Sequence, residues 1–187
     1  MMQYNFQYLE RNLMDLIAEE QAKLGYRREA VRLYYPLSSL CHLLDGPAEG
    51  KTGLQLNADE MQTALELFAE SVADKFGNVK ISHKNIRFCF LLPEEASDYV
   101  HEHQEESRFI YDLVSLIAAH GTTMEDIKEF FRSQEAECVI EDIGGEEFDT
   151  LIRFADSEDR YYYCFRDEIV HIIYHRFLPE DYHDLYD

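Results

Sequence analysis

Apolar residues recur at helical spacing over much of the first 134 residues of the chain. The clearest helix is predicted between Asn57, whose side chain suits an N-cap, and Gly77, which favours a helix end. Its apolar side chains share one face, and they are Met61, Leu65, Phe68, Val72 and Phe76. The same spacing predicts further helices over residues 5–24, 27–44, 93–104 and 108–119.

Local signals refine this helical part. Pro36 lies inside the helix predicted over 27–44 and should kink or restart it. Thr122 with Glu125 three residues later forms the pattern of a capping box, which predicts a helix that continues to about Arg132. The short apolar run over 86–92 ends at Pro93 and predicts one buried strand.

The spacing of apolar residues changes from a helical period to a strand period in the last third of the chain. Four runs rich in β-branched and aromatic residues predict strands over 138–143, 148–155, 161–165 and 169–177. The connections are short, which indicates an antiparallel sheet, and Pro179 begins a last short helix. We therefore predict an α+β protein of one domain over 1–187. A helical N-terminal part, about 1–134, packs with a C-terminal antiparallel sheet of about four strands, about 135–187.

Charge is distributed unevenly along the 187 residues, which carry a net charge of −21. Residues 1–93 hold 12 acidic and 10 basic side chains, a net of −2, whereas residues 94–187 hold 26 acidic and 7 basic, a net of −19. Such a field repels phosphate backbones and anionic lipids, so we expect neither nucleic acid nor membrane as a partner. It favours a basic protein partner or a cation, and the simpler alternative is an acidic surface that only keeps the protein soluble.

The chain contains no apolar run of a length that could span a membrane, and its start has no basic segment or cleavage pattern of a signal peptide. We therefore expect a cytoplasmic protein. The four cysteines are far apart, form no C-x-x-C pair and are expected to be reduced thiols packed among apolar neighbours.

Known catalytic and cofactor motifs are missing from the sequence. It contains no G-x-S-x-G, P-loop or G-x-G-x-x-G pattern, so we expect no cofactor and lean against an enzyme. Residues 108–132 have a helix-turn-helix spacing, but Glu125 and Asp126 begin the second helix, where a DNA reader needs neutral or basic side chains. A helical hairpin used for packing is the better interpretation.

Two groups of polar residues are candidate sites. Asp98, His101, Glu102 and Glu105 share a helical face at i, i+3, i+4 and i+7, which suits a divalent cation, although a solvated acidic face has the same pattern. The second group lies in the aromatic C-terminal part, where a pocket wall is predicted to contain His171, His175, Arg176 and Tyr182. His171 and His175 lie on a predicted strand, about 13 Å apart at about 3.3 Å per residue, so the two cannot hold one ion together. Ring packing with buried hydroxyls bonded to backbone is the alternative explanation of the aromatic stretch.

Three aromatic phrases resemble an uncharacterised bacterial family. They are Leu33-Tyr34-Tyr35-Pro36-Leu37, Tyr161-Tyr162-Tyr163-Cys164-Phe165 and Ile173-Tyr174-His175-Arg176-Phe177, followed by Glu180-Asp181-Tyr182. The resemblance covers nearly the whole chain, and it implies a bacterial, cytoplasmic protein of one domain. The family is a domain of unknown function with no assigned activity, so no role transfers from it.

The charge asymmetry gives the leading functional hypothesis, a binding or regulatory protein whose acidic C-terminal half engages a basic partner. The alternative is a small-ligand binder or an enzyme that uses the aromatic-His-Arg surface near the C-terminus. A third hypothesis is a divalent-cation binder that uses the face from Asp98 to Glu105.

Overall fold

The computed structural model describes residues 3–46 and 51–187, which form two compact units, 1–112 and 113–187. Each unit is described by itself. The expectation that the chain forms one domain stays a prediction. Helix α6 (Arg108–Ala118) contains the point where the two units meet in the sequence.

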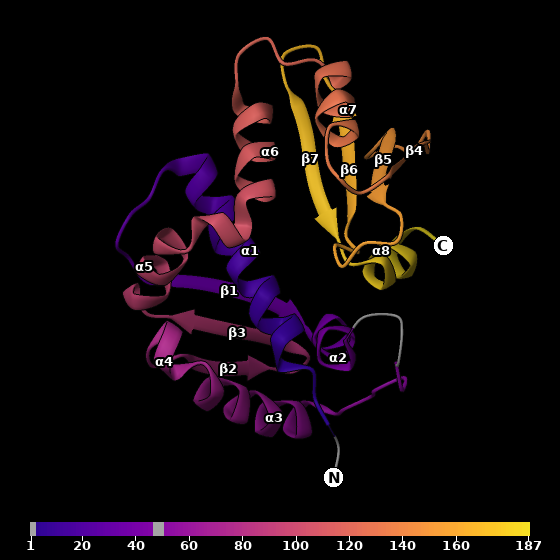
Figure 1. The fold of residues 1–187 in the computed structure, drawn as a ribbon. Coiled ribbons are helices and arrows are strands. Elements are labelled where there is room, and N and C mark those ends of the chain that lie inside the picture. The colour runs from indigo at the N-terminus through magenta and orange to yellow at the C-terminus, as the bar shows by residue number, and fades with distance from the viewer. Residues whose placement is uncertain (1–2, 47–50) are drawn as a thin grey trace. The chain divides into compact units, whose positions relative to one another are not determined.

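The first unit combines helices with a three-stranded antiparallel sheet of order β1-β3-β2 (Figure 1). The strands are β1 (Val31–Pro36), β2 (Lys80–Lys84) and β3 (Arg87–Leu92). The helices before α6 are α1 (Phe6–Leu24), α2 (Leu37–Asp45), α3 (Ala58–Ser71), α4 (Ala73–Phe76), α5 (Glu94–Glu102) and the 3-10 turn η1 (Gln104–Ser107). Helix α3 begins with a capping box between Asn57 and Glu60, so the expected N-cap is confirmed.

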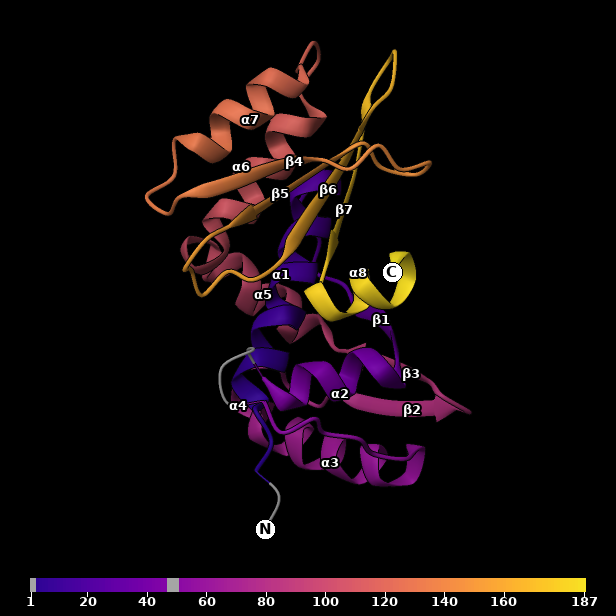
Figure 2. The ribbon, with the colours of Figure 1, turned by 90° about the vertical axis from the view of Figure 1, so that its right-hand side faces the viewer.

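One face of this sheet is buried against helices, which Figure 2 shows gathered on one side of it. Phe88, Phe90 and Leu92 alternate along β3 and are fully buried. The Phe90 ring meets the ring of Phe68 from α3 at 6.5 Å. The helices therefore enclose a core on one face and leave the other face of the sheet without a covering helix from this unit.

The helix expected over 27–44 is wrong in its first half. Residues 31–36 form β1, which pairs along its whole length with β3, and α2 begins only at Leu37. Val31, Leu33 and Tyr35 alternate with outward side chains, which is the period of a strand rather than of a helix. Pro36 ends the strand and is the N-cap residue of α2, so the expected kink is wrong and the expected restart of a helix at this residue is confirmed. Strand β2 was not anticipated, so the N-terminal part is not purely helical.

The second unit contains the expected antiparallel sheet, in the order β4-β5-β6-β7. Its strands are β4 (Cys138–Asp142), β5 (Thr150–Phe154), β6 (Tyr162–Asp167) and β7 (Ile172–Phe177), with helices α7 (Met124–Arg132) and α8 (Pro179–Tyr186). The α+β class and the four-stranded C-terminal sheet are thus confirmed.

Both faces of this sheet are packed. On one face the buried ring of Phe131 from α7 lies 5.2 Å from Tyr163 and 5.5 Å from Phe154. On the other face Phe177 and Cys164 are buried in a cluster against which Tyr182 of α8 packs. Aromatic side chains thus hold a helix to each face of the sheet.

The capping box that starts α7 lies one residue later than expected. The Thr123 hydroxyl accepts the Asp126 amide at 3.2 Å, and Asp126 accepts the Thr123 amide at 2.8 Å. Thr122 instead donates its hydroxyl to the carbonyl of Leu116 at 2.6 Å, near the end of α6. Because Thr122 and Thr123 are followed by Glu125 and Asp126, the capping box could form with either threonine. Thr122 is instead bonded to a carbonyl of α6, so Thr123 forms the box.

Two further expectations concern the whole chain. All four cysteines are free, with Cys41 and Cys164 buried and Cys89 and Cys138 half-buried. Burial raises the pKa of the Cys164 thiol to about 12, which leaves it unreactive. Among the described residues, the helices are all too short or too polar to cross a membrane.

Candidate functional site

The largest excess of acidic side chains lies on β4 and its connection to β5. We call residues 135–150 the acidic hairpin; its seven acids, with no Lys or Arg among them, are Glu135, Glu137, Glu141, Asp142, Glu146, Glu147 and Asp149. All of them except the half-buried Asp149 are exposed. Strand β4 is also an edge of its sheet, so the hairpin presents both carboxylates and a free strand edge.

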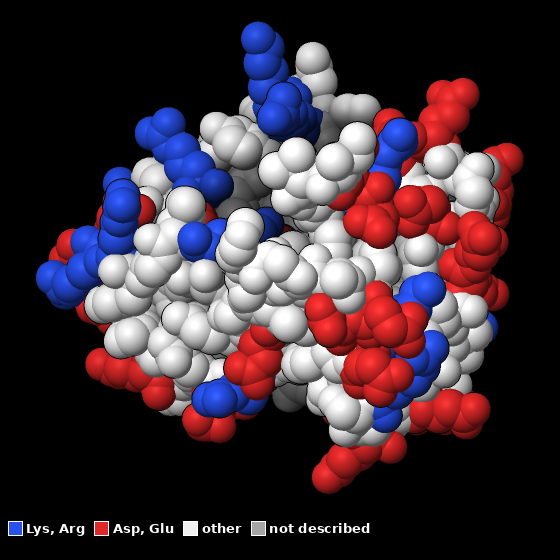
Figure 3. All heavy atoms as spheres, turned by 90° about the horizontal axis from the view of Figure 1, so that it is seen from above, with Lys and Arg blue, Asp and Glu red and all other residues white. Residues whose placement is uncertain are grey.

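The carboxylates of the acidic hairpin are not neutralised by neighbouring cations. Among the described residues, none of the seven forms an ion pair with Lys or Arg. Arg132 and Arg166, two of the cations of this unit, are held by Glu129 at 2.7 Å and by Glu168 at 2.8 Å. Figure 3 shows acidic side chains gathered into groups on the face in view. The hairpin therefore keeps its negative charge available to a partner.

A few contacts fix the shape of the hairpin. The Asp149 carboxylate accepts the Thr150 hydroxyl at 2.9 Å and the Asp167 amide at 3.3 Å. Glu147 accepts the Tyr186 hydroxyl at 2.5 Å, and burial together with this carboxylate raises the pKa of Tyr186 to about 12. These bonds orient two carboxylates without cancelling their charge.

A hollow of about 330 Å³ lies between Lys128 of α7 and the paired strands β4 and β5. Its lining consists of Lys128, Ile140, Asp142, Asp149 and Thr150. The lining contains two carboxylates, one ammonium group and the apolar side chain of Ile140, so the hollow is acidic on balance. A Lys or Arg side chain of a partner matches this combination.

The predicted pocket around the last strand is not assembled. His175 and Arg176 are neighbours in β7 and therefore point to opposite faces of the sheet. The His175 ring packs 4.3 Å from the Phe177 ring, while the Arg176 guanidinium lies 4.4 Å above the ring of Tyr161. Each of the two side chains packs against an aromatic ring on its own face of the sheet.

The other two residues of that group lie apart from these contacts. His171 is exposed in the turn before β7, where its carbonyl accepts the Glu168 amide at 3.0 Å. Tyr182 packs from α8 on Tyr162, with ring centres 5.4 Å apart, and burial raises its pKa. The four side chains do not converge, and the aromatic stretch packs the unit instead.

The predicted cation face is likewise not assembled. Asp98 accepts hydrogen bonds from the Tyr26 hydroxyl and from Arg28, whose Nε lies 2.8 Å away. These two donors hold the pKa of the Asp98 carboxyl below its usual range, with Tyr26 the larger cause. The carboxylate is thus already satisfied by protein donors rather than left for a metal ion.

The rest of that face is also occupied or dispersed. His101 stacks on the Tyr26 ring at 3.8 Å, and its Nδ1 lies 2.8 Å from the side-chain amide of Gln104. Glu102 is exposed, and Glu105 lies in η1, 3.7 Å from Arg108. Among the described residues, these side chains and Asp98 do not bring three ligand atoms within 4.8 Å of one another. Helix α5 ends at Glu102, so the i+7 position leaves the helical face on which the prediction rested.

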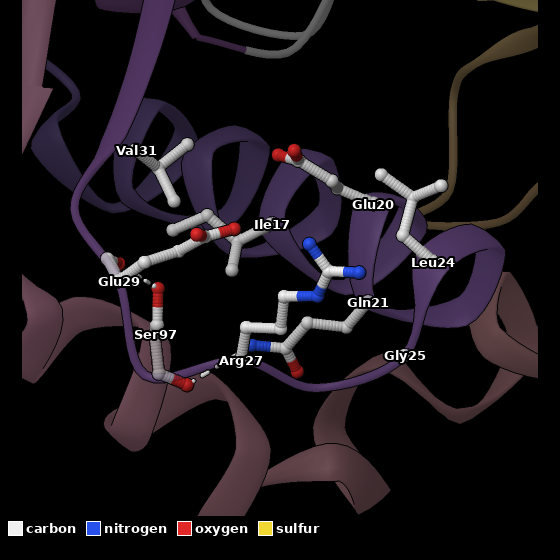
Figure 4. Close-up of a pocket in the computed structure, with 9 residues that line it drawn as sticks. All are labelled: Ile17, Glu20, Gln21, Leu24, Gly25, Arg27, Glu29, Val31 and Ser97. Atoms are coloured by element: carbon white, nitrogen blue, oxygen red, sulfur yellow. Dashed lines mark hydrogen bonds between the residues drawn. The ribbon is translucent and has the colours of Figure 1, made fainter.

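One small pocket in the first unit was not anticipated (Figure 4). It has a volume of about 20 Å³ and lies between α1, the segment before β1 and Ser97 of α5. Gln21 is 5% exposed and donates through Nε2 to the Ser97 carbonyl at 3.0 Å, whereas its Oε1 has no hydrogen-bond partner among the described residues. The volume suits one water molecule, which would satisfy this oxygen. The sequence signal for this pocket was Gln21, a polar residue four positions after Ile17 on the apolar face of the first helix.

These features define an α+β protein with an exposed acidic hairpin on an edge strand and with no assembled catalytic or metal site among its predicted residues. Residues 6–186 match the family described as a domain of unknown function, E. rectale gene description (DUF3877). The chain belongs to this family, which agrees with the resemblance seen in its aromatic phrases. No match was found among curated proteins or among solved structures.

Proposed function

We propose that the protein is a binding or regulatory protein whose acidic hairpin engages a basic protein partner. The observation that carries this proposal is the set of seven carboxylates over residues 135–150 that have no Lys or Arg partner. Exposed charges of one sign increase the rate of encounter with an oppositely charged partner and select against partners of the same sign. The free edge of β4 and the hollow beside Lys128 supply directional contacts for a partner that has arrived.

We place this interaction in the cytoplasm of a bacterium. The family is named from a bacterium, and the four free cysteines are of a kind that a reducing compartment maintains. The proposal needs no cofactor and no catalytic group.

The test is capture of partners from a bacterial lysate by the immobilised full chain, at moderate and at high salt. The hairpin variant carries Gln at Glu135, Glu137 and Glu141, three exposed positions. We expect basic proteins to be retained by the wild type, to be released as salt rises, and to be lost from the variant. Salt acts this way because the screening length falls from about 8 Å at physiological ionic strength to about 3 Å at 1 M, which weakens the contacts at the interface.

A matched variant removes the same charge from the first unit, with Gln at the exposed residues Glu70, Glu102 and Glu106. This control should retain the same partners as the wild type. Capture that does not depend on salt, or that falls equally in both variants, would refute the proposal.

A further inference from the structure

The uncovered face of the sheet in the first unit is basic. Side chains alternate along β3, so Arg87, Cys89 and Leu91 point away from the buried phenylalanines. Cross-strand partners point to the same side, which adds residues from β1 and β2 to this face. We call it the basic face; its charged and aromatic members are Arg32, Tyr34, Lys80, Lys84 and Arg87.

The register orders these residues into three rows. Arg32 and Lys80 flank Leu91 at one end, and Lys84 lies beside Arg87 at the other. The middle row places Tyr34, which is 53% exposed, next to the half-buried Cys89. The middle row also contains the exposed Ser82 and carries no charge, so cations lie at both ends of a less polar centre, which is the pattern of a protein interface with a charged rim.

The cations of this face have no acidic partner. Within the described part of the chain, Arg32, Lys80, Lys84 and Arg87 form no ion pair, and no Asp or Glu belongs to the three rows. The chain has 38 acidic and only 17 basic residues, so four unpaired cations on one face are a large part of its positive charge. They are positioned for an acidic surface from outside the first unit.

We infer that the basic face binds the acidic hairpin of a second copy of this chain. This inference rests on the proposed function, because it names one basic partner for the hairpin. The hairpin contributes seven unpaired carboxylates and the face four unpaired cations, so the two surfaces are complementary in sign, and the hairpin also has half-buried Ile140 and Ile143 to meet Tyr34.

Nucleic acid fits the same face less well. Base stacking needs open aromatic rings, but the guanidinium of Arg87 lies 4.8 Å above the Tyr34 ring, the one aromatic ring of the three rows. The net charge of −21 also repels a polyphosphate chain at every approach. A protein surface with a limited number of carboxylates needs no open ring for stacking, and it is repelled less than a polyphosphate chain.

The geometry has a consequence for the assembly. Each copy carries both surfaces, so the contact joins two different patches and is heterologous. Such contacts continue from copy to copy until a ring closes, and the mass should rise with concentration. Self-association should be strongest at moderate salt. A screening length of about 8 Å there weakens the long-range repulsion between two acidic molecules but leaves the short contacts at the interface. At 1 M salt the screening length is about 3 Å, and the contacts at the interface are weakened as well.

The experiment measures the mass of the full chain by light scattering during size-exclusion chromatography, over a series of concentrations. We expect values that rise above the 22.1 kDa of one chain at moderate salt and return to it at high salt. A face variant with Gln at Arg32, Lys80 and Lys84 should remain a single chain, as should the hairpin variant with Gln at Glu135, Glu137 and Glu141.

An equimolar mixture of the two variants gives the sharpest result. The hairpin variant keeps an intact basic face, and the face variant keeps an intact hairpin, so the mixture should form a species of twice 22.1 kDa that cannot grow further. Control substitutions Lys23→Gln and Arg27→Gln, which remove exposed cations outside the face, should leave the association of the wild type unchanged. Circular dichroism of each variant confirms that it is folded.

Two outcomes would overturn the inference: a single chain at every concentration and salt, or association that persists in both variants. Neither outcome bears on the proposed function, which stands or falls on capture of other basic proteins by the hairpin. Loss of that capture with intact self-association, or the reverse, separates the two ideas.

Discussion

Tyr163 offers the sharpest test of how the second unit is held together. Its side chain is 0% exposed, and its hydroxyl donates to the Asp159 carboxylate at 2.6 Å. Tyr163→Phe keeps the ring, which packs 5.2 Å from Phe131, and removes this bond. A hydrogen bond to a charged group contributes about 1.5–3 kcal/mol. Asp159 is half-buried and regains water, so we expect a loss of about 1.5–2 kcal/mol in the free energy of unfolding.

Tyr162→Phe is the matched control, one residue away on the opposite face of β6. Its hydroxyl lies 3.5 Å from His183 Nε2, too far for a strong bond, so this change should stay within about 0.5 kcal/mol. Urea unfolding followed by circular dichroism gives both values, and hydrogen exchange over β4 to β7 assigns the loss to this unit. Equal values for the two variants would refute the idea that the buried bond stabilises the fold.

The same bond predicts a dependence on alkaline pH. Burial, and after it the charge of Asp159, raises the pKa of Tyr163 well above its usual value. A group that stays protonated longer in the folded state stabilises it fully below the unfolded pKa, about 10, and this contribution is lost as pH rises further. The wild type should therefore lose stability above about pH 10 more steeply than Tyr163→Phe. Parallel curves for the two proteins would contradict this assignment.

Three further changes test other parts of the structure. Phe131→Ala should lower the free energy of unfolding by about 3–5 kcal/mol, because Phe131 is 0% exposed between α7 and the sheet. Phe130→Ala should lower it clearly less, because Phe130 is half-buried, and thermal unfolding compares the two variants. Gly46→Ala should destabilise the protein more than Gly121→Ala, although both glycines have φ +84°. A Cβ at Gly46 would lie 2.6 Å from the side chain that caps α1, whereas a Cβ at Gly121 would have no atom within 4 Å. Thr123→Ala should cost about 1 kcal/mol through loss of the N-cap of α7, measured by urea unfolding.

The parts of the fold that the sequence predicted correctly have strong local periods. The four C-terminal strands and the stripe from Met61 to Phe76 each repeat one period, although the structure divides the one helix predicted for that stripe into α3 and α4 at Val72. Strand β1 was misassigned because the leucines at positions 33, 37, 40 and 44 continue a helical spacing across the end of a strand. Strand β2 has one apolar residue, Ile81, so no hydrophobic pattern could predict it, and its pairing with β3 decides its conformation.

The candidate sites were harder to predict because they depend on where elements end and which strands pair. The cation face failed because α5 stops at Glu102, and the pocket group failed because neighbouring strand residues point apart. The basic face needs the register of β2 against β3, which places Lys84 beside Arg87. The acidic hairpin was visible as a stretch without Lys or Arg, because a charge pattern needs no tertiary information.

The acidity of the second unit exceeds what solubility requires. Residues 113–187 hold 19 acidic and 6 basic side chains, a net of −13, whereas a small domain is kept soluble by a net charge of about 2–8. Charged residues on edge strands also protect against pairing between sheets. The other edge strand, β7, lies within residues 169–178, which include no Asp or Glu, so the acids are concentrated at one edge of the sheet. The number and the place of the seven carboxylates are therefore the observations on which the proposed recognition of a basic surface rests.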